Sequence, residues 1–593
     1  MTDLDRLDVL ARGWRGRLFA ALVALIAGLP GLMALPVLDR DEAGFVQSTA
    51  QMLETGDFID IKLQDQARER EPIGLHWLQA ASVSAFSSTE ARQVWAYRIP
   101  SLLGAMLAAA ACAWGAAVFF GPGAGAMAGA ILGGCLILST EAGIGKTDAV
   151  LCGAITLAIA AMGRLYAASN GGPAADRRTR LLFWLALALA VLDKGLVGPM
   201  VAVVTGLTLW AWDRRAPWIR TLGWTWGLIL FAALVGPWLA AITVRTDGQA
   251  WGGDLVSSLL DKRPGGGPWG LHVLMAPLLL FPAAALLPAA LVEGWKARTQ
   301  PGPRFALCWL IANWLVFERA PVRLIHHALP LYGALAWLAA FAMTRTLGRY
   351  TRIAGAVFSV LSGAAIAAGI GYVAARYGDP SSAAPAVFAG VLAVTAGVCG
   401  AWTMTAPNRT ARYFWPTLAA AGGLGVAAHA AVVVGLAPRL QSLWLSRGVV
   451  ETLDRSGLNP RNGLAPGPVT VVGYGEPSLV FGLGTETELG DPPDAVEAIS
   501  EGRPVVIDAD AAAWFQHALN DAGLKATLVG SIAGLDYADG QQAVLRIYRS
   551  DSPPPDNPAD DAAEPDSKLA QPSPSKSPAL KPGAALKPGE HKP

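Results

Sequence analysis

An acidic pair, Asp41 and Glu42, closely follows the first long apolar segment of the chain, Leu18 to Leu38. An ionised carboxylate loses several kcal/mol on leaving water unless another group compensates, so acidic residues at a membrane boundary need a specific reason. Catalysis is one such reason, because an exposed carboxylate can take a proton from a hydroxyl acceptor. The alternative is structural, since both residues could cap the first turn of a helix and oppose its dipole.

Basic and acidic residues also occur together at three later places. The first is the turn Arg68 to Pro72, which leads into His76; arginine is suited to phosphate, and a solvated loop is the alternative. The other two are Lys146-Thr147-Asp148 and Asp193-Lys194-Gly195. Their structural alternatives are a helix cap and a simple ion pair.

Two further groups are less specific. Arg263 ends the triplet Asp261-Lys262-Arg263, and His326-His327 precedes Leu329-Pro330. A packed or solvated histidine pair is the simpler interpretation, and a divalent metal is the open alternative because carboxylates occur nearby. The sequence has no Cys/His spacing of a metal site, so we assign neither metal ligands nor a cofactor.

The composition identifies the class of protein. Of the 593 residues, 53% are hydrophobic and 15% are charged, whereas soluble domains carry roughly 25% charged residues. The chain is therefore an integral membrane protein. The net charge of +1 gives no global field for nucleic acid. The five cysteines all fall in apolar segments and are interpreted as small core residues.

Apolar segments long enough to cross a bilayer predict about thirteen spans. The stretch Leu181 to Trp212 is too long for one span and has a charged break at Asp193-Lys194-Gly195, which predicts a hairpin of two short helices. The predicted starts are near Leu18, Tyr97, Gly125, Ala149, Leu181, Leu196, Leu222, Leu271, Phe305, Ala328, Ile353, Ala386 and Trp415.

Basic residues set the predicted orientation. Arginine and lysine gather in the N-terminus and in connections that fall on one side of the membrane, which is therefore cytoplasmic. The polar groups above face the other side, the periplasm of a Gram-negative cell. The N-terminal apolar run is too long for a signal peptide and lacks a clear cleavage site, so we predict an uncleaved anchor.

We predict five regions. They are a cytoplasmic N-terminus (1–17), a transmembrane domain (18–448) with a large first periplasmic loop (39–95), a soluble α/β domain (449–549) and a disordered tail (550–593) rich in Pro, Ala, Lys and Asp. Glu42 to Leu53 is predicted to lie on the membrane as an amphipathic helix that ends near Gly56. In the α/β domain, a helix is expected over Asp510 to Ala522, with strands over Val469–Val472, Ser478–Phe481, Val505–Asp508, Ala526–Val529 and Val544–Tyr548.

Several short motifs occur in a fixed order along the chain: Asp41-Glu42, Glu54-Thr55-Gly56-Asp57, Pro72 to Trp77, Tyr97-Arg98-Ile99-Pro100-Ser101, Lys146-Thr147-Asp148, Lys194-Gly195 and Leu329-Pro330-Leu331-Tyr332. This order resembles the membrane glycosyltransferases of the type-C fold. It is most similar to the bacterial aminoarabinose–lipid A transferase and protein O-mannosyltransferase superfamily. The resemblance covers roughly residues 17 to 550.

The resemblance implies a transferase that takes a sugar from a polyprenyl-phosphate donor in the periplasm. It implies that Asp41 is the catalytic base or orients the acceptor, that Asp148 is a second acidic residue of the active site, and that Lys194 and Arg263 lie near the donor phosphate. Two positions depart from the family pattern. Glu71 replaces a lysine of Lys-Pro-Pro, so that either Arg70 substitutes or the donor differs, and His327 stands where many members have tyrosine.

We therefore predict an inner-membrane glycosyltransferase whose acceptor is lipid A, a protein or a glycan and whose partners also include membrane lipids but no nucleic acid. Two other hypotheses are a transporter or lipid flippase, which would place charges near the bilayer midplane, and a non-catalytic assembly partner. The predicted site residues are Asp41, Glu42 and Asp148 for catalysis; Arg70, Lys194 and Arg263 for the donor phosphate; and Glu71, His76, Lys146, His326 and His327 for the substrate pocket.

Overall fold

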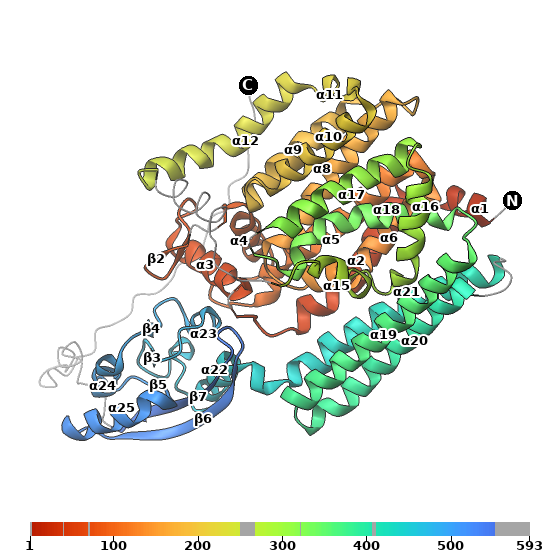
Figure 1. Ribbon diagram of the computed structural model, residues 1–593. Helices are drawn as coiled ribbons and strands as arrows, with labels where there is room; N and C mark the ends of the chain where they lie inside the picture. Colours follow the sequence, from red (N-terminus) through yellow and green to blue (C-terminus); the bar gives the residue numbers. More distant parts are fainter. Residues whose placement is uncertain are drawn as a thin grey trace, which may run out of the picture.

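The computed structural model describes residues 3–39, 41–68, 71–248, 267–320, 322–405 and 411–551. Figure 1 shows a bundle of helices, a group of long helices that crosses one side of it, and a small α/β domain near the first loop of the chain. Among these described residues, eight helical segments are long and apolar enough to span a membrane, or up to ten if each of two bent pairs counts as one span. The mostly helical membrane class and the C-terminal α/β region are confirmed, and the count of thirteen spans stays a prediction.

The centre of the bundle is α5 (Val94–Phe120), which packs against α2, α6 and α8. Small residues allow this packing: a Cβ on Gly153 of α8 would lie 2.5 Å from the backbone oxygen of Gly104 on α5. The other helices of this part are α1 (Asp3–Leu10), α2 (Arg15–Ala34), α6 (Pro122–Gly133), α7 (Leu136–Ala142) and α8 (Thr147–Ser169).

The predicted hairpin is confirmed. Helix α9 (Arg177–Lys194) ends at Gly195, whose φ of +59° favours glycine, and α10 (Val197–Asp213) follows. Because α9 packs on both α8 and α10, the break brings Lys194 to the beginning of α8. Two more helices complete this group, α11 (Pro217–Arg220) and α12 (Trp224–Arg245).

The second half of the membrane region contains a broken pair and several long helices. α15 and the segment ending in α16 meet at a bend of 119°, and α19 packs along α20 on the side of the bundle (Figure 1). The elements are α15 (Leu271–Leu279), η1 (Ala283–Leu286), α16 (Leu287–Lys296), α17 (Pro301–Arg319), η2 (Ile325–Leu331), α18 (Tyr332–Met343), α19 (Arg349–Tyr377), α20 (Ala383–Thr405) and α21 (Ala411–Ala430).

The first loop folds into α3 (Asp41–Thr55), the short pair β1 (Lys62–Leu63) and β2 (Gln66–Ala67), and α4 (Gly74–Phe86). Gly56, with a φ of +71°, follows α3 as expected. The amphipathic prediction for this helix is wrong, because every residue from Glu42 to Ala50 is buried. Helix α4 covers it on one side and the C-terminal domain covers another, so α3 is a core element.

The C-terminal domain is a five-stranded sheet in the order β4-β3-β5-β7-β6. Strands β3, β4 and β5 are parallel, and β7 pairs antiparallel with β5 and β6. Its elements are α22 (Leu445–Arg455), β3 (Thr470–Val472), α23 (Pro477–Leu483), β4 (Glu488–Leu489), α24 (Pro492–Ser500), β5 (Val505–Asp508), α25 (Ala509–Asp521), β6 (Ala526–Asp536) and β7 (Gln541–Ser550).

Four of the five strands and the helix predicted here are present. The segment Ser478–Phe481 is not a strand but part of helix α23. Pro477 at its first position and Gly484 after its end are the usual limits of a helix, and they outweigh the short apolar run. The predicted disordered tail falls almost entirely outside the described residues.

Candidate active site

Glu42 of α3 and Arg98 of α5 form a fully buried ion pair between the first loop and the helix bundle. The guanidinium of Arg98 donates to both carboxylate oxygens of Glu42 at 2.6 Å, and neither side chain is exposed. The same carboxylate also accepts the backbone N–H groups of Leu38 and Gly145, at 3.0 and 2.6 Å. Because its oxygens are engaged and enclosed, Glu42 joins the first loop to α5 and does not face a substrate. This differs from its predicted catalytic role.

A second group of charges, the Lys194 cluster, collects residues from five separate segments. Lys194 Nζ lies 3.0 Å from Asp148 Oδ1 and 3.6 Å from Glu71 Oε1. The other oxygen of Asp148 lies 3.3 Å from Lys146 Nζ, which is in turn 3.1 Å from Glu141 Oε2. His326 lies beside them, with its ring nitrogens 3.7 Å from Asp148 and 3.5 Å from Lys146 Nζ. We define the cluster as Glu71, Glu141, Lys146, Asp148, Lys194 and His326.

One side of this cluster is open. The side chains of Glu71, Lys194 and His326 are 23%, 20% and 18% exposed, whereas Glu141, Lys146 and Asp148 are each 8% exposed. Lys194 is therefore the more accessible of the two cluster ammonium groups. Burial raises the pKa of Glu71, as does the charge of Asp148, and the charge of Lys194 opposes them. Within the described part of the chain, one oxygen of Glu71 has no hydrogen-bond partner, so this carboxylate is held loosely.

Asp41 stands at the edge of the same cluster. It is exposed at the first residue of α3, next to the buried Glu42. Its charge is close enough to raise the pKa values of Glu71 and Lys146. Burial lowers the pKa of Lys146, but the carboxylates of Glu141 and Asp148 outweigh it and raise the value overall. The site thus combines an exposed carboxylate with an ammonium group that two carboxylates orient.

Two of the remaining predicted site residues, His76 and His327, are described and are not part of this cluster. His76 is 1% exposed in the contact between α3 and α4, where its Nδ1 lies 2.7 Å from the Thr49 hydroxyl. Burial and the nearby Arg68 lower its pKa to about 3. A buried neutral ring of this kind packs the core, which differs from the predicted role in the pocket. The ring of His327 lies against that of His326. Arg70 and Arg263 lie outside the described residues.

Two residues that matter here, Arg98 and Glu141, are absent from the predicted site residues. Arg98 enters the prediction only as part of a motif, although an arginine four residues into an apolar segment requires a buried anion as partner. Glu141 was passed over, although it is an acidic residue in an apolar stretch five positions before Lys146. In both cases the signal was an ionisable residue where the neighbouring sequence is apolar.

A divalent metal at the histidine pair His326-His327 is the open alternative in the sequence prediction. In the described ranges, no group of three or more His, Cys, Asp or Glu side chains is arranged to hold a metal ion. The cluster carboxylates face lysine ammonium groups, an arrangement that does not suit a cation.

The helix arrangement, with this polar site at one end and an α/β domain beside it, is the type-C membrane glycosyltransferase fold. It matches the crystal structure of ArnT from Cupriavidus metallidurans bound to undecaprenyl phosphate, with a TM-score of 0.68 over 89% of this chain and 97% of that one. The two sequences are 18% identical, so this likeness concerns the fold.

Sequence relatives agree with the resemblance found from the motifs. The chain is 28% identical over 314 residues to the undecaprenyl phosphate-alpha-4-amino-4-deoxy-L-arabinose arabinosyl transferase of Aeromonas salmonicida, covering 51% of this chain and 56% of that protein. The protein of the same name from Pectobacterium atrosepticum is 26% identical over 383 residues, covering 62% and 67%. The chain thus spans little more than half the length of the first of these relatives. No family model matches it.

Proposed function

We propose that this protein is an inner-membrane glycosyltransferase that moves a sugar from a polyprenyl-phosphate donor to an acceptor hydroxyl on the periplasmic side. The observation that carries the proposal is the Lys194 cluster: the exposed Asp41 is close enough for its charge to act on Glu71 and Lys146, and Asp148 holds the accessible ammonium of Lys194 at 3.0 Å in the same cluster. Similarity in fold to a protein solved with undecaprenyl phosphate supports a lipid-linked donor.

The reaction is a single displacement. The acceptor oxygen attacks the anomeric carbon while its proton passes to Asp41. The bond between that carbon and the phosphate oxygen breaks, and its electron pair leaves on the polyprenyl phosphate. Lys194 stabilises the charge that develops there, as fixed cations do at leaving groups, and Arg70 and Arg263 remain predicted partners. Attack from the face opposite the leaving group inverts the anomeric centre.

The roles of the other cluster residues follow from their contacts. Asp148 touches both lysines and fixes their positions, and Glu141 holds Lys146 from the far side. His326 and Glu71 form the open side with Lys194. We assign all four to positioning and substrate contact rather than proton transfer. No step of the proposal passes through a metal ion.

Two measurements test the proposal. Mass spectrometry of lipid A and of periplasmic glycoproteins, from cells with and without the gene, should reveal one missing glycan mass and so name both the sugar and the acceptor class. The purified Asp41→Asn protein should lose about 10²- to 10⁴-fold in transfer while its melting temperature stays unchanged, because Asp41 is exposed. Full activity in that variant would exclude Asp41 as the base. Lipid movement without any transfer would favour a flippase.

A further inference from the structure

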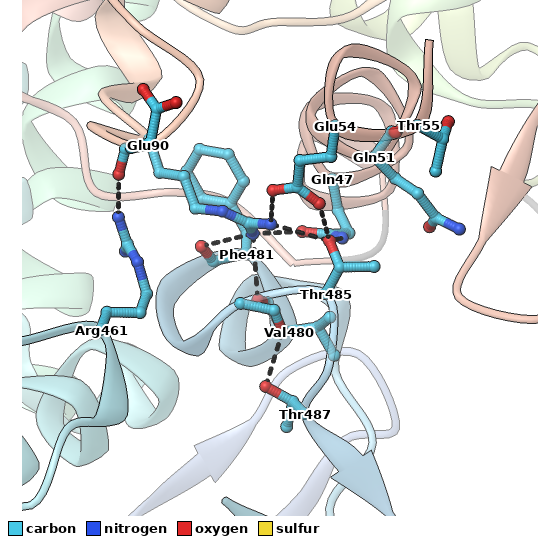
Figure 2. Close-up of polar contacts among 12 residues, drawn as sticks. Gln47, Gln51, Glu54, Thr55, Glu90, Arg461, Val480, Phe481, Thr485 and Thr487 are labelled. Atoms are coloured by element: carbon cyan, nitrogen blue, oxygen red, sulfur yellow. Dashed lines mark hydrogen bonds and ion pairs between the residues drawn. The ribbon is translucent and has the colours of Figure 1, made fainter. Parts of the chain in front are cut away.

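The C-terminal domain is attached directly to the first loop, at the elements that carry Asp41. Figure 2 shows Gln47 and Glu54 of α3 facing Thr485, which follows α23. Gln47 Nε2 donates to the Thr485 hydroxyl at 2.8 Å, and that hydroxyl donates to Glu54 at 2.6 Å. Arg92 adds bonds to the backbone oxygens of Val480 and Phe481, at 3.3 and 3.0 Å. These contacts hold the domain against the side of α3.

A second contact reaches the beginning of α3. The backbone N–H of Asp39 donates to the hydroxyl of Tyr537 at 2.6 Å. The backbone oxygen of Asp39 accepts the N–H of Asp41 at 2.9 Å. Two hydrogen bonds therefore connect Tyr537, in the C-terminal domain, with the backbone of the proposed catalytic base.

The opposite side of this segment is fixed by the membrane domain. Arg98 donates to the backbone oxygens of Leu35 and Pro36 at 2.7 and 2.8 Å, and Glu42 accepts the N–H of Leu38. Asp41 thus stands between two anchored points, Asp39 and Glu42. Only one of these anchors, Asp39, depends on the C-terminal domain.

Two side chains of the C-terminal domain, Tyr537 and Ser478, contact Asp39. Tyr537 lies in the turn between β6 and β7, and its ring packs on that of Trp444. In the same turn, the Asp536 carboxylate accepts the N–H of Ala538 at 2.9 Å. The carboxyl of Asp39 lies against Ser478, and burial raises its pKa to about 6 against the opposing effects of Ser478 and Tyr537. Ser478 follows the carboxyl end of β3, whose parallel neighbours β4 and β5 lie on opposite sides. This edge is where open α/β sheets take their ligands.

We propose that the C-terminal domain positions the catalytic base of the transferase site. The domain binds Asp39 of the first loop, and the hydrogen bond from Asp39 to Tyr537 fixes the position of Asp41. The inference rests on the proposed function. It assigns the domain a role in turnover and not in holding the donor, because the Lys194 cluster comes entirely from other parts of the chain.

Tyr537→Phe tests this by removing one hydroxyl. We expect the turnover number to fall about tenfold, as the loss of one hydrogen bond allows, while the KM for the polyprenyl-phosphate sugar changes less than twofold. Hydrogen exchange of the Asp39 amide should accelerate, and the melting temperature should stay within a few degrees. Tyr350→Phe, on an 86% exposed tyrosine of α19, is the matched control and should change none of these values.

The outcomes separate the two proposals. A normal turnover number in Tyr537→Phe, with an inactive Asp41→Asn protein, would overturn the positioning role and leave the transferase intact. An active Asp41→Asn protein would reject Asp41 as the base whatever Tyr537 does. If Tyr537→Phe fails to fold, Asp536→Ala loosens the same turn without removing the tyrosine. It should lower turnover in the same direction, and unchanged turnover in that variant would equally contradict the inference.

Discussion

Two groups of charges in this protein use the same residue types and behave differently. The Glu42–Arg98 pair is closed: both side chains are fully buried and the bonds are 2.6 Å long. The Lys194 cluster is open on one side, and its contact with Glu71 is 3.6 Å long. Carboxylates whose oxygens are fully used hold the fold together, whereas charges left accessible and loosely paired are available to a substrate.

The numbers of charges sharpen the comparison. In the closed pair one cation meets one anion. Within the cluster as defined from the described residues, the three carboxylates of Glu71, Glu141 and Asp148 face the two ammonium groups of Lys146 and Lys194. An anionic donor must therefore compete with the protein's own carboxylates for Lys194, and Glu71, the most exposed of them, is the one it can displace.

The largest effect is expected in the closed pair. Arg98→Met leaves the Glu42 carboxylate buried without its cation, and removing one partner of such a pair costs about 3–5 kcal/mol of folding stability. The variant should be recovered in low yield and melt at a clearly lower temperature in a tryptophan fluorescence assay. Glu42→Gln should also destabilise the protein. A Glu42→Gln protein that is stable but inactive would instead support the predicted catalytic role of Glu42.

The open cluster should respond in activity rather than in stability. Lys194→Gln removes the accessible cation, and the loss of one stabilising group at a leaving oxygen lowers activity by about 100-fold or more. The fold should survive, because Lys146 still lies 3.3 Å from the second oxygen of Asp148. Steady-state transfer and thermal melting are the two measurements.

The control for this variant is Lys296→Gln, a lysine whose side chain is 61% exposed near Glu293 in α16. It should leave transfer unchanged. Equal transfer by the Lys194→Gln and Lys296→Gln proteins would show that the open cluster does not hold the donor phosphate.

Much of the cluster could be predicted from the sequence, because charged residues are rare in an apolar chain and must have partners or face water. Asp148, for example, contacts both Lys194 and His326, so these charged residues do have partners. The charge pattern alone could not distinguish Asp41, which the family resemblance singles out, from Glu42. Neighbouring residues on a helix point in different directions, and the choice depends on Arg98, which lies 56 positions after Glu42. The sequence likewise could not show that α3 is buried, because the residues that cover it include α23, more than 400 positions away.

The smallest predicted effect concerns the pH dependence of donor binding. Because burial raises the pKa of Glu71, this carboxyl is neutral over a wider pH range than a free glutamate. Below its pKa it does not compete for Lys194; as the pH rises through the pKa, Glu71 ionises and the KM for the donor should increase. The donor phosphodiester carries one charge throughout, so it adds no titration of its own.

Glu71→Gln isolates this contribution. At pH values above the pKa of Glu71, the KM of this variant for the donor should be a few-fold lower than that of the unchanged protein, and its KM should vary less with pH. Glu71→Asp keeps the charge, so it should retain the pH dependence. Among the described residues, the other charged groups that face Glu71 are Lys194, Asp148, Arg68, Asp41 and the neighbouring Asp193, and they remain in both variants. A steep pH profile that persists unchanged in Glu71→Gln would locate the titration elsewhere and remove Glu71 as the competitor for Lys194. A flattened profile would show that the donor phosphate binds Lys194 by displacing Glu71, which contacts Lys194 at 3.6 Å.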